Sequence, residues 1–285
     1  MARFINPFTD VGFKLIFGQA INKDLLMDFL NSLFEGEKRI TDITFLDKEM
    51  LGFSVEDRSC IYDIYCTNED GEHFIVEMQN RGHVNFRERA LFYLSQAIVR
   101  QGEKGVGWLF DLKAVYGIFF MNFRLGGLGD KLRTDVLLAD RDTHQIFTDK
   151  MRYVFLQLPS FQKDETSCET DFERWIYILK NMDTLQRMPF KLRKAVFQRL
   201  EDIVDIASLS KEDRIKYDES IKTYRDNLVT EAYALQKGRT EGRAEGFLEA
   251  NRRNARAMKA KGLPMELIAE ITGLSAQEIN DLDGK

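Results

Sequence analysis

The alternation of apolar and polar residues predicts a β-hairpin in the first third of the chain. Residues 61–67 and 73–79 are rich in β-branched and aromatic side chains, which favour strands. The segment between them, 68–72, contains Asn, Asp and Gly, the residues typical of tight turns. The pattern therefore predicts two neighbouring antiparallel strands.

A symmetric loop fixes which residues of this hairpin face one another. If Thr67 lies opposite His73, then Asp63 lies opposite Glu77, and opposed Cβ atoms are about 4.5–5.5 Å apart. Since side chains alternate between the faces of a strand, Gln79 shares the face of Glu77. Two carboxylates and an amide are thus expected side by side.

The remaining periodicity predicts a helix-rich N-terminus, a sheet, and then helices. The continuous apolar run over 113–123 is typical of a central strand covered on both faces. In the helix predicted over 85–102, the expected core positions are Ala90, Leu91, Leu94, Ala97 and Ile98. The other predicted elements are two helices within 6–36, strands over 40–46, 135–140 and 153–158, and helices from 164 to 236 that cover the sheet with side chains such as Ile215, Leu228 and Tyr233.

The end of the chain differs from the rest. Gly238, Gly242 and Gly246 recur every four residues, and each Gly costs about 1 kcal/mol in a helix, so we expect a flexible linker; close contact between helices is the alternative. Residues 263–279 carry a helix, a Gly turn, a Ser cap and a second helix, as in a small helix-turn-helix. Its second helix is acidic or neutral, which favours packing or oligomerisation over reading DNA.

Composition and charge narrow the class of protein. The 285 residues carry a net charge of −5 and are 44% hydrophobic, enough for a sizeable core. Residues 237–261 hold eight Lys or Arg against three Glu, so the tail is cationic and the body acidic. Three cysteines form no CxxC pair, and neither a signal peptide nor a membrane span is evident, so we expect a cytoplasmic protein with reduced thiols.

The paired carboxylates have two interpretations. Asp63 and Glu77 repel each other, and a divalent cation between them would relieve that repulsion, because hard cations take carboxylate oxygens. The alternative is a solvated edge hairpin without a metal. Zinc-protease, hydrolase-elbow, P-loop, dinucleotide and kinase motifs are all missing from the sequence.

Two helices carry further candidates. Asp10 and Lys14 lie one turn apart, which by itself indicates an exposed ion pair. Arg89, Tyr93 and Gln96 form a polar, basic stripe on the helix that follows the hairpin. This stripe could hold a phosphate backbone or could be a solvated face.

In order and spacing, four motifs resemble the PD-(D/E)xK nuclease superfamily, and more narrowly the Rpn-type recombination-promoting nucleases, a transposase family. The opening Asn-Pro-Phe-Thr-Asp-Val-Gly-Phe-Lys motif of residues 6–14 is similar to that family's N-terminal helix. Tyr62-Asp63-Ile and Ile75-Val-Glu77-Met-Gln79 resemble its catalytic core, and residues 87–93 resemble the helix that follows. The Gly-rich tail is also similar to tails of that family.

This resemblance implies an α/β, restriction-endonuclease-like fold, a mixed β-sheet flanked by helices and followed by a helical region and a helical tail. We expect three parts: a nuclease-like core over 1–163, a helical extension packed on it over 164–236, and a basic Gly-rich linker with a helix-turn-helix-like tail over 237–285.

The resemblance also implies roles for single residues. Asp63, Glu77 and the Met78 carbonyl would bind Mg²⁺ or Mn²⁺, and Gln79 would orient the attacking water. Two departures stand out: Tyr62 replaces the Pro before the Asp, and Gln79 replaces the Lys and supplies no positive charge. The residues expected to lie along the nucleic acid are Asp10, as an outer carboxylate, and Lys14, Arg87, Arg89, Tyr93 and Gln96.

The sequence therefore predicts a metal-dependent DNA endonuclease that acts in recombination or transposition, with little base readout and with the helical tail as a site of homo-oligomerisation. The alternative is a nucleic-acid-binding or oligomeric interaction protein that keeps the nuclease fold with weak or no catalysis. The sequence leaves RNA open as a substrate.

Overall fold

The computed structural model describes residues 2–50, 60–102, 109–191 and 194–283. The chain divides into two compact units, Met1–Lys222 and Thr223–Lys285. The three-part division expected from the sequence stays a prediction.

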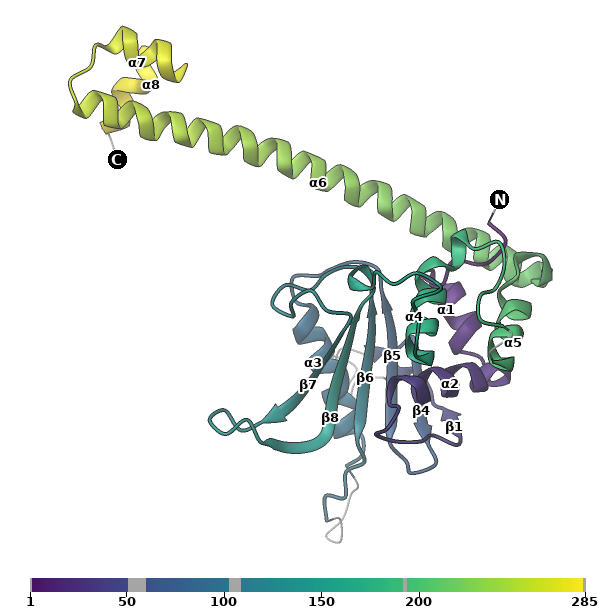
Figure 1. Ribbon diagram of the computed structural model, residues 1–285. Coiled ribbons are helices and arrows are strands. Elements are labelled where there is room, and N and C mark those ends of the chain that lie inside the picture. The colour runs from purple at the N-terminus through teal and green to yellow at the C-terminus, as the bar shows by residue number, and fades with distance from the viewer. Residues whose placement is uncertain (1, 51–59, 103–108, 192–193, 284–285) are drawn as a thin grey trace. The chain divides into compact units, whose positions relative to one another are not determined.

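The first unit is built on a mixed sheet of six strands (Figure 1). The hairpin strands pair antiparallel in the register predicted from the sequence, with Thr67 opposite His73 and Ile64 opposite Val76. The central strand β6 runs parallel to both of its neighbours, β5 and β8. In spatial order the strands are β1 (Ile43–Phe45), β4 (Ile64–Asn68), β5 (His73–Gln79), β6 (Val115–Met121), β8 (Ile146–Gln157) and β7 (Arg133–Ala139), and a separate pair consists of β2 (Glu49–Met50) and β3 (Cys60–Ile61).

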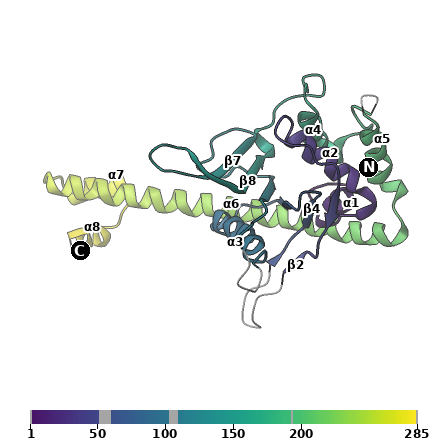
Figure 2. The same ribbon diagram turned by 90° about the horizontal axis from the view of Figure 1, so that it is seen from below.

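Helices cover both faces of this sheet (Figure 2). Helix α3 (Phe86–Val99) packs its Phe86, Ala90, Leu94 and Ala97 on one face. It comes so close to β6 that a Cβ atom on Gly117 would lie 2.5 Å from Leu94 Cδ1. On the other face, the Phe120 ring contacts Phe13 of α1 (Asp10–Phe17) and Phe29 of α2 (Lys23–Leu33), with centroids 5.6 and 5.0 Å apart.

Later helices extend this second layer. Trp175 of α4 (Asp171–Asn181) lies fully buried, with its ring centroid 5.5 Å from that of Phe17 and 5.3 Å from that of Phe197 on α5 (Ala195–Val204). The short 3₁₀ helices are Ala20–Asn22, Leu158–Ser160, Met182–Thr184, Ile206–Ser208 and Asp281–Asp283.

The second unit contains the later part of α6 (Lys211–Ala260) and the short helices α7 (Met265–Thr272) and α8 (Ala276–Asn280). Gly273 has a φ of 69° and ends α7, and Ser275 begins α8 with a capping box. The helix, Gly turn, Ser cap and second helix predicted from the sequence are therefore confirmed. A small core joins these helices, made of Ala255, Ile268, Leu274, Ile279 and Leu282.

Two details of the prediction were wrong. The glycine repeat forms no flexible linker, because Gly238, Gly242 and Gly246 lie inside the 50-residue helix α6. The strong helix formers between the glycines (Arg, Glu, Ala) offset their cost. Leu91 is 54% exposed instead of facing the core, since the face that contacts the sheet is narrower than the apolar pattern. The side chains of Ile215, Leu228 and Tyr233 are exposed.

The predicted fold class is confirmed: a mixed sheet flanked by helices, followed by further helices. Of the helices in the described ranges, none combines the length and the apolar character needed to cross a bilayer. The described thiols of Cys66 and Cys168 are free and buried.

Candidate active site

Asp63 and Glu77 meet as the hairpin register predicts. Asp63 lies immediately before β4, and Glu77 lies within β5. The Asp63 amide donates to Glu77 Oε1 (3.1 Å), and the Met78 amide donates to Asp63 Oδ2 (2.9 Å). Each carboxylate therefore accepts a main-chain hydrogen bond from the other strand. These two hydrogen bonds hold the two carboxylates side by side.

Burial makes this carboxylate pair electrostatically costly. Glu77 is only 1% exposed. Burial, and next the neighbouring Asp63 charge, raise the pKa of Glu77 to about 8, although the Asp63 amide, Arg89 and Gln79 act against this. Burial likewise raises the pKa of Asp63. A buried and a half-buried carboxyl with raised pKa values are typical of a functional site rather than of a solvated edge.

Gln79 completes the group on the same face of β5. Its Nε2 donates to Glu77 Oε2 (3.0 Å), and the side chain is buried. The predicted cluster of Asp63, Glu77 and Gln79 is therefore assembled in the structure. Gln79 contributes a hydrogen bond and no charge, so any positive charge must come from elsewhere.

Arg89 is the cation closest to Glu77 that the structure describes. Its Nη2 lies 4.0 Å from Glu77 Oε2, and its guanidinium sits over the Tyr93 ring, 5.0 Å from the centroid. Tyr93 is in turn joined to the residue before Asp63: the Tyr62 hydroxyl donates to the Tyr93 carbonyl (2.9 Å). Tyr62, which stands where the superfamily has Pro, thus ties α3 to the carboxylate strand.

Lys14 and Asp10 lie near Asp63 as well as near each other. Lys14 Nζ lies 2.5 Å from Asp10 Oδ1, the local ion pair expected from their spacing. The Lys14 charge also lowers the pKa of Asp63, and the Asp10 charge raises it. Lys14 and Asp10 therefore form a local ion pair and also lie close enough to Asp63 for their charges to act on it.

Lys48, which was not among the residues predicted from the sequence, also lies near Asp63, Asp10 and Lys14. Burial and the charge of Lys14 lower its pKa, and Asp10 and Asp63 act in the opposite direction. Its carbonyl accepts a hydrogen bond from the Tyr62 amide (3.0 Å). Lys48 precedes β2, which pairs with β3 in a separate sheet, so no residue spacing in the hairpin indicates its position.

The N-terminal motif places α1 at this site through main-chain contacts. Thr9 Oγ1 accepts from the Gly12 amide (3.0 Å) and donates to the Asn6 carbonyl (2.9 Å). A Cβ atom on Gly12 would lie 2.2 Å from the Asn6 oxygen, so only Gly fits there. The side-chain Nδ2 of Asn80, the residue directly after Gln79, donates to the Phe8 main-chain carbonyl. The start of α1 is therefore tied to the end of β5.

The other two predicted contact residues on α3 lie apart from the carboxylates. The Arg87 guanidinium donates to the Gly126 carbonyl. Gln96 is half-buried, two turns beyond Arg89. Among the residues described, no contact joins Arg87 or Gln96 to Asp63 or Glu77, and their roles stay predictions.

The donor atoms fit a hard divalent cation. Two carboxylates, a nearby amide and main-chain carbonyls are oxygen ligands of the kind Mg²⁺ prefers, and Mg²⁺ usually keeps several waters. Within the described ranges, no group of three or more His, Cys, Asp or Glu is placed to hold a metal. A cation at Asp63 and Glu77 would therefore need water and amide or carbonyl oxygens besides the two carboxylates.

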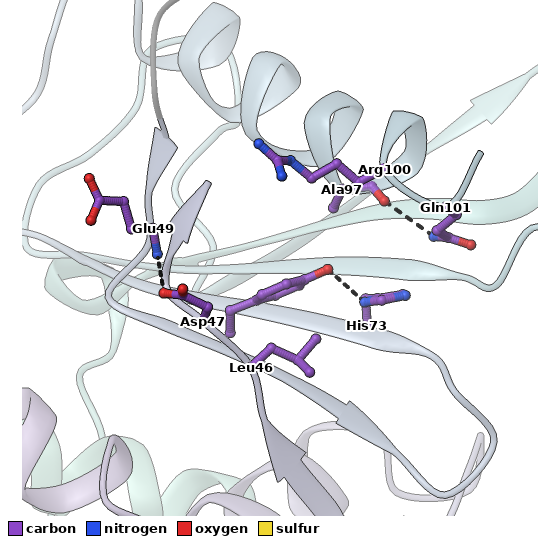
Figure 3. Close-up of a pocket in the computed structure, with 8 residues that line it drawn as sticks. Leu46, Asp47, Glu49, His73, Ala97, Arg100 and Gln101 are labelled. Atoms are coloured by element: carbon purple, nitrogen blue, oxygen red, sulfur yellow. Dashed lines mark hydrogen bonds between the residues drawn. The ribbon is translucent and has the colours of Figure 1, made fainter. Parts of the chain in front are cut away.

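A separate cavity of about 330 Å³ lies at the C-terminal end of α3 (Figure 3). Its lining includes Tyr65, His73 and Arg100, and the Tyr65 hydroxyl lies 2.7 Å from His73 Nδ1. Neither of the paired carboxylates lines it, so we treat it as distinct from the candidate active site.

Comparison with known proteins agrees with this geometry. The family model described as PD-(D/E)XK nuclease family transposase matches residues 7–234, which include the whole sheet and the carboxylate pair. No curated protein and no solved structure matches the chain significantly. The match covers well over half of the sequence, and the chain belongs to the PD-(D/E)XK nuclease family of transposases.

Proposed function

We propose that this protein is a Mg²⁺- or Mn²⁺-dependent DNA endonuclease that hydrolyses phosphodiester bonds during recombination or transposition. The observation that carries the proposal is the pairing of buried Glu77 with half-buried Asp63, which exchanged main-chain hydrogen bonds hold together. A buried like-charged pair is costly by itself, and a bound cation gives it a use.

In the proposed mechanism, Asp63, Glu77 and the Met78 carbonyl hold the cation. When bound, the cation polarises a phosphoryl oxygen and lowers the pKa of a coordinated water. Gln79, now hydrogen-bonded to Glu77 Oε2, orients the attacking water with the same amide. Asp10 adds an outer carboxylate.

The DNA backbone would lie along the basic side of the site. Arg89 and Lys14 are the cations whose charges act on Glu77 and Asp63, so they would contact the phosphates nearest the cleaved bond. Tyr93, Arg87 and Gln96 would extend this contact along α3. Because these are phosphate contacts, we expect little sequence readout. We also propose a cytoplasmic location and homo-oligomerisation through the helical tail.

The second candidate is an interaction protein that keeps the fold and binds nucleic acid with weak or no cleavage. One observation favours it: Gln79 stands where a Lys would supply charge, and its amide is engaged with Glu77. RNA in place of DNA as the substrate belongs to the outcomes of the test below.

A plasmid-cleavage assay separates these candidates. Purified protein would be incubated with supercoiled DNA in Mg²⁺, in Mn²⁺ and in EDTA, beside Asp63→Ala and the matched control Asp142→Ala, an exposed turn residue. We expect metal-dependent nicking that Asp63→Ala abolishes and Asp142→Ala leaves intact. Intact plasmid with all metals, together with retained DNA binding, would refute the nuclease proposal. Cleavage of a single-stranded RNA in parallel reactions, with the plasmid left intact, would refute DNA as the substrate.

A further inference from the structure

A cavity of about 830 Å³ opens beside the candidate active site at the N-terminal half of α3. It lies within the size range of small-molecule binding sites. Arg89, which lies 4.0 Å from Glu77, is part of its wall. One side chain, Arg89, therefore both lines the cavity and approaches the carboxylate pair.

The lining of this cavity is aromatic as well as polar. Phe92 and Tyr93, consecutive residues of α3, both line the cavity, and Phe92 is 39% exposed although it is a large apolar residue. Ile61, 61% exposed, adds a further apolar surface next to Asp63. An exposed aromatic side chain in a concave wall next to a cation offers a stacking surface for a flat ring.

This wall is fixed relative to the carboxylates. The Tyr62 hydroxyl donates to the Tyr93 carbonyl, and the Tyr62 and Tyr93 rings meet edge to face with centroids 5.2 Å apart. Arg89 over the Tyr93 ring adds a cation–π contact. A ring bound here would thus be held at a defined position relative to Glu77.

Two polar groups in the lining, Glu88 and Asn85, suit a nucleobase better than a second phosphate. Glu88 is exposed and acidic, so it would repel a phosphate but can accept a hydrogen bond from the amino group of a base. Asn85 is the N-cap residue of α3, yet its side chain does not cap the helix and can pair with a base edge.

We infer that this cavity binds an unpaired nucleobase next to the cleaved phosphate, stacked on Phe92, and that the substrate is DNA with a single-stranded segment. The inference rests on the proposed nuclease function, because it takes Glu77 and Asp63 to mark the cleaved bond. A base paired inside a duplex has both of its faces covered by neighbours and cannot enter the cavity without leaving the stack.

The test measures binding and cleavage separately. A fluorescently labelled 20-nucleotide single strand, and the same sequence as a duplex, are titrated in EDTA with wild type, Phe92→Leu and Leu91→Ala. Leu91 is the matched control, because it is an exposed apolar neighbour on α3 that does not line the cavity. We expect the single strand to bind more tightly than the duplex, and Phe92→Leu to weaken single-strand binding by about 5- to 100-fold, the scale of one stacked base.

Equal affinities of wild type and Phe92→Leu for the single strand would overturn the inference, as would a matching loss with Leu91→Ala. Phe92→Tyr, which keeps the stacking face, should restore binding, and thermal melting of each variant checks its fold. Binding in EDTA that depends on Phe92, without any cleavage in Mg²⁺, supports the inference and refutes the nuclease proposal. If fully paired DNA is cleaved and Phe92→Leu leaves that cleavage unchanged, the nuclease proposal is supported and the inference is refuted.

Discussion

Replacing Glu77 with Gln should stabilise the metal-free protein. Most substitutions of a buried, hydrogen-bonded side chain destabilise a protein. Glu77 is different because its charge is buried beside Asp63, and both burial and that neighbour raise its pKa. Without a cation, the wild type must either bind a proton at Glu77 or carry two adjacent charges, that of Glu77 buried and that of Asp63 half-buried. Gln keeps the shape and removes the ionisable group.

The size of this effect follows from the pKa of Glu77. Burial, together with the Asp63 charge, raises it from 4.5 to about 8. The raised pKa lowers the free energy of unfolding by about 1.36 kcal/mol for each pH unit above 4.5. At pH 7 this loss is at most roughly 3 kcal/mol. In Glu77→Gln, the side-chain NH2 group replaces an oxygen that accepts a hydrogen bond from either the Asp63 main-chain N–H or Gln79 Nε2. Two donors then face each other, which costs about 1 kcal/mol. The net gain is about 2 kcal/mol, or about 4–8 °C in Tm.

The sign of the pH dependence gives a second check. The folded-state pKa of Glu77 lies above the unfolded-state value, so the wild type incurs no cost below about pH 4.5. The cost grows as the pH rises toward about 8 and is constant beyond it. Thermal melts of wild type and Glu77→Gln in EDTA should therefore diverge between pH 5 and pH 8. Glu88→Gln, an exposed acid on α3, should change stability by no more than about 0.5 kcal/mol. A Glu77→Gln protein that melts at or below the wild-type temperature at pH 8 would refute this reasoning.

Four further outcomes are expected. Mg²⁺ at a hundred times its Kd should stabilise the wild type by about 2.7 kcal/mol, measured by melting, and should not stabilise the Glu77 variant. Arg89→Met should slow plasmid nicking by roughly 10-fold or more, because it removes the charge beside Glu77. Asn80→Ala should cost about 1–2 kcal/mol in urea unfolding, since Asn80 bonds the Phe8 carbonyl. Gly242→Ala should raise helix content by circular dichroism, because its Cβ meets open space; a lost oligomer instead would indicate contact between helices at the glycines.

The strands could be predicted because their patterns are local. The all-apolar run of β6 indicates a strand covered on both faces, and the turn chemistry between Thr67 and His73 fixes the hairpin register. The tail could not be assigned in the same way. A Gly every fourth residue lowers helix propensity, but the cost is offset along a helix as long as α6. Local propensity alone does not give that length.

In the candidate site, too, the residues that are close in sequence could be predicted, and the partners from distant parts of the chain could not. Asp63, Glu77 and Gln79 lie within one hairpin, so counting residues across a symmetric turn is enough to bring them together. Their electrostatic partners come from elsewhere in the chain: Arg89 from α3, and Lys48 from the segment before β2. The position of Arg89 depends on how α3 crosses the sheet, and that of Lys48 on how β2 pairs with β3, and no spacing in the hairpin specifies either. A search for the charge that Gln79 lacks therefore has to begin with these long-range neighbours.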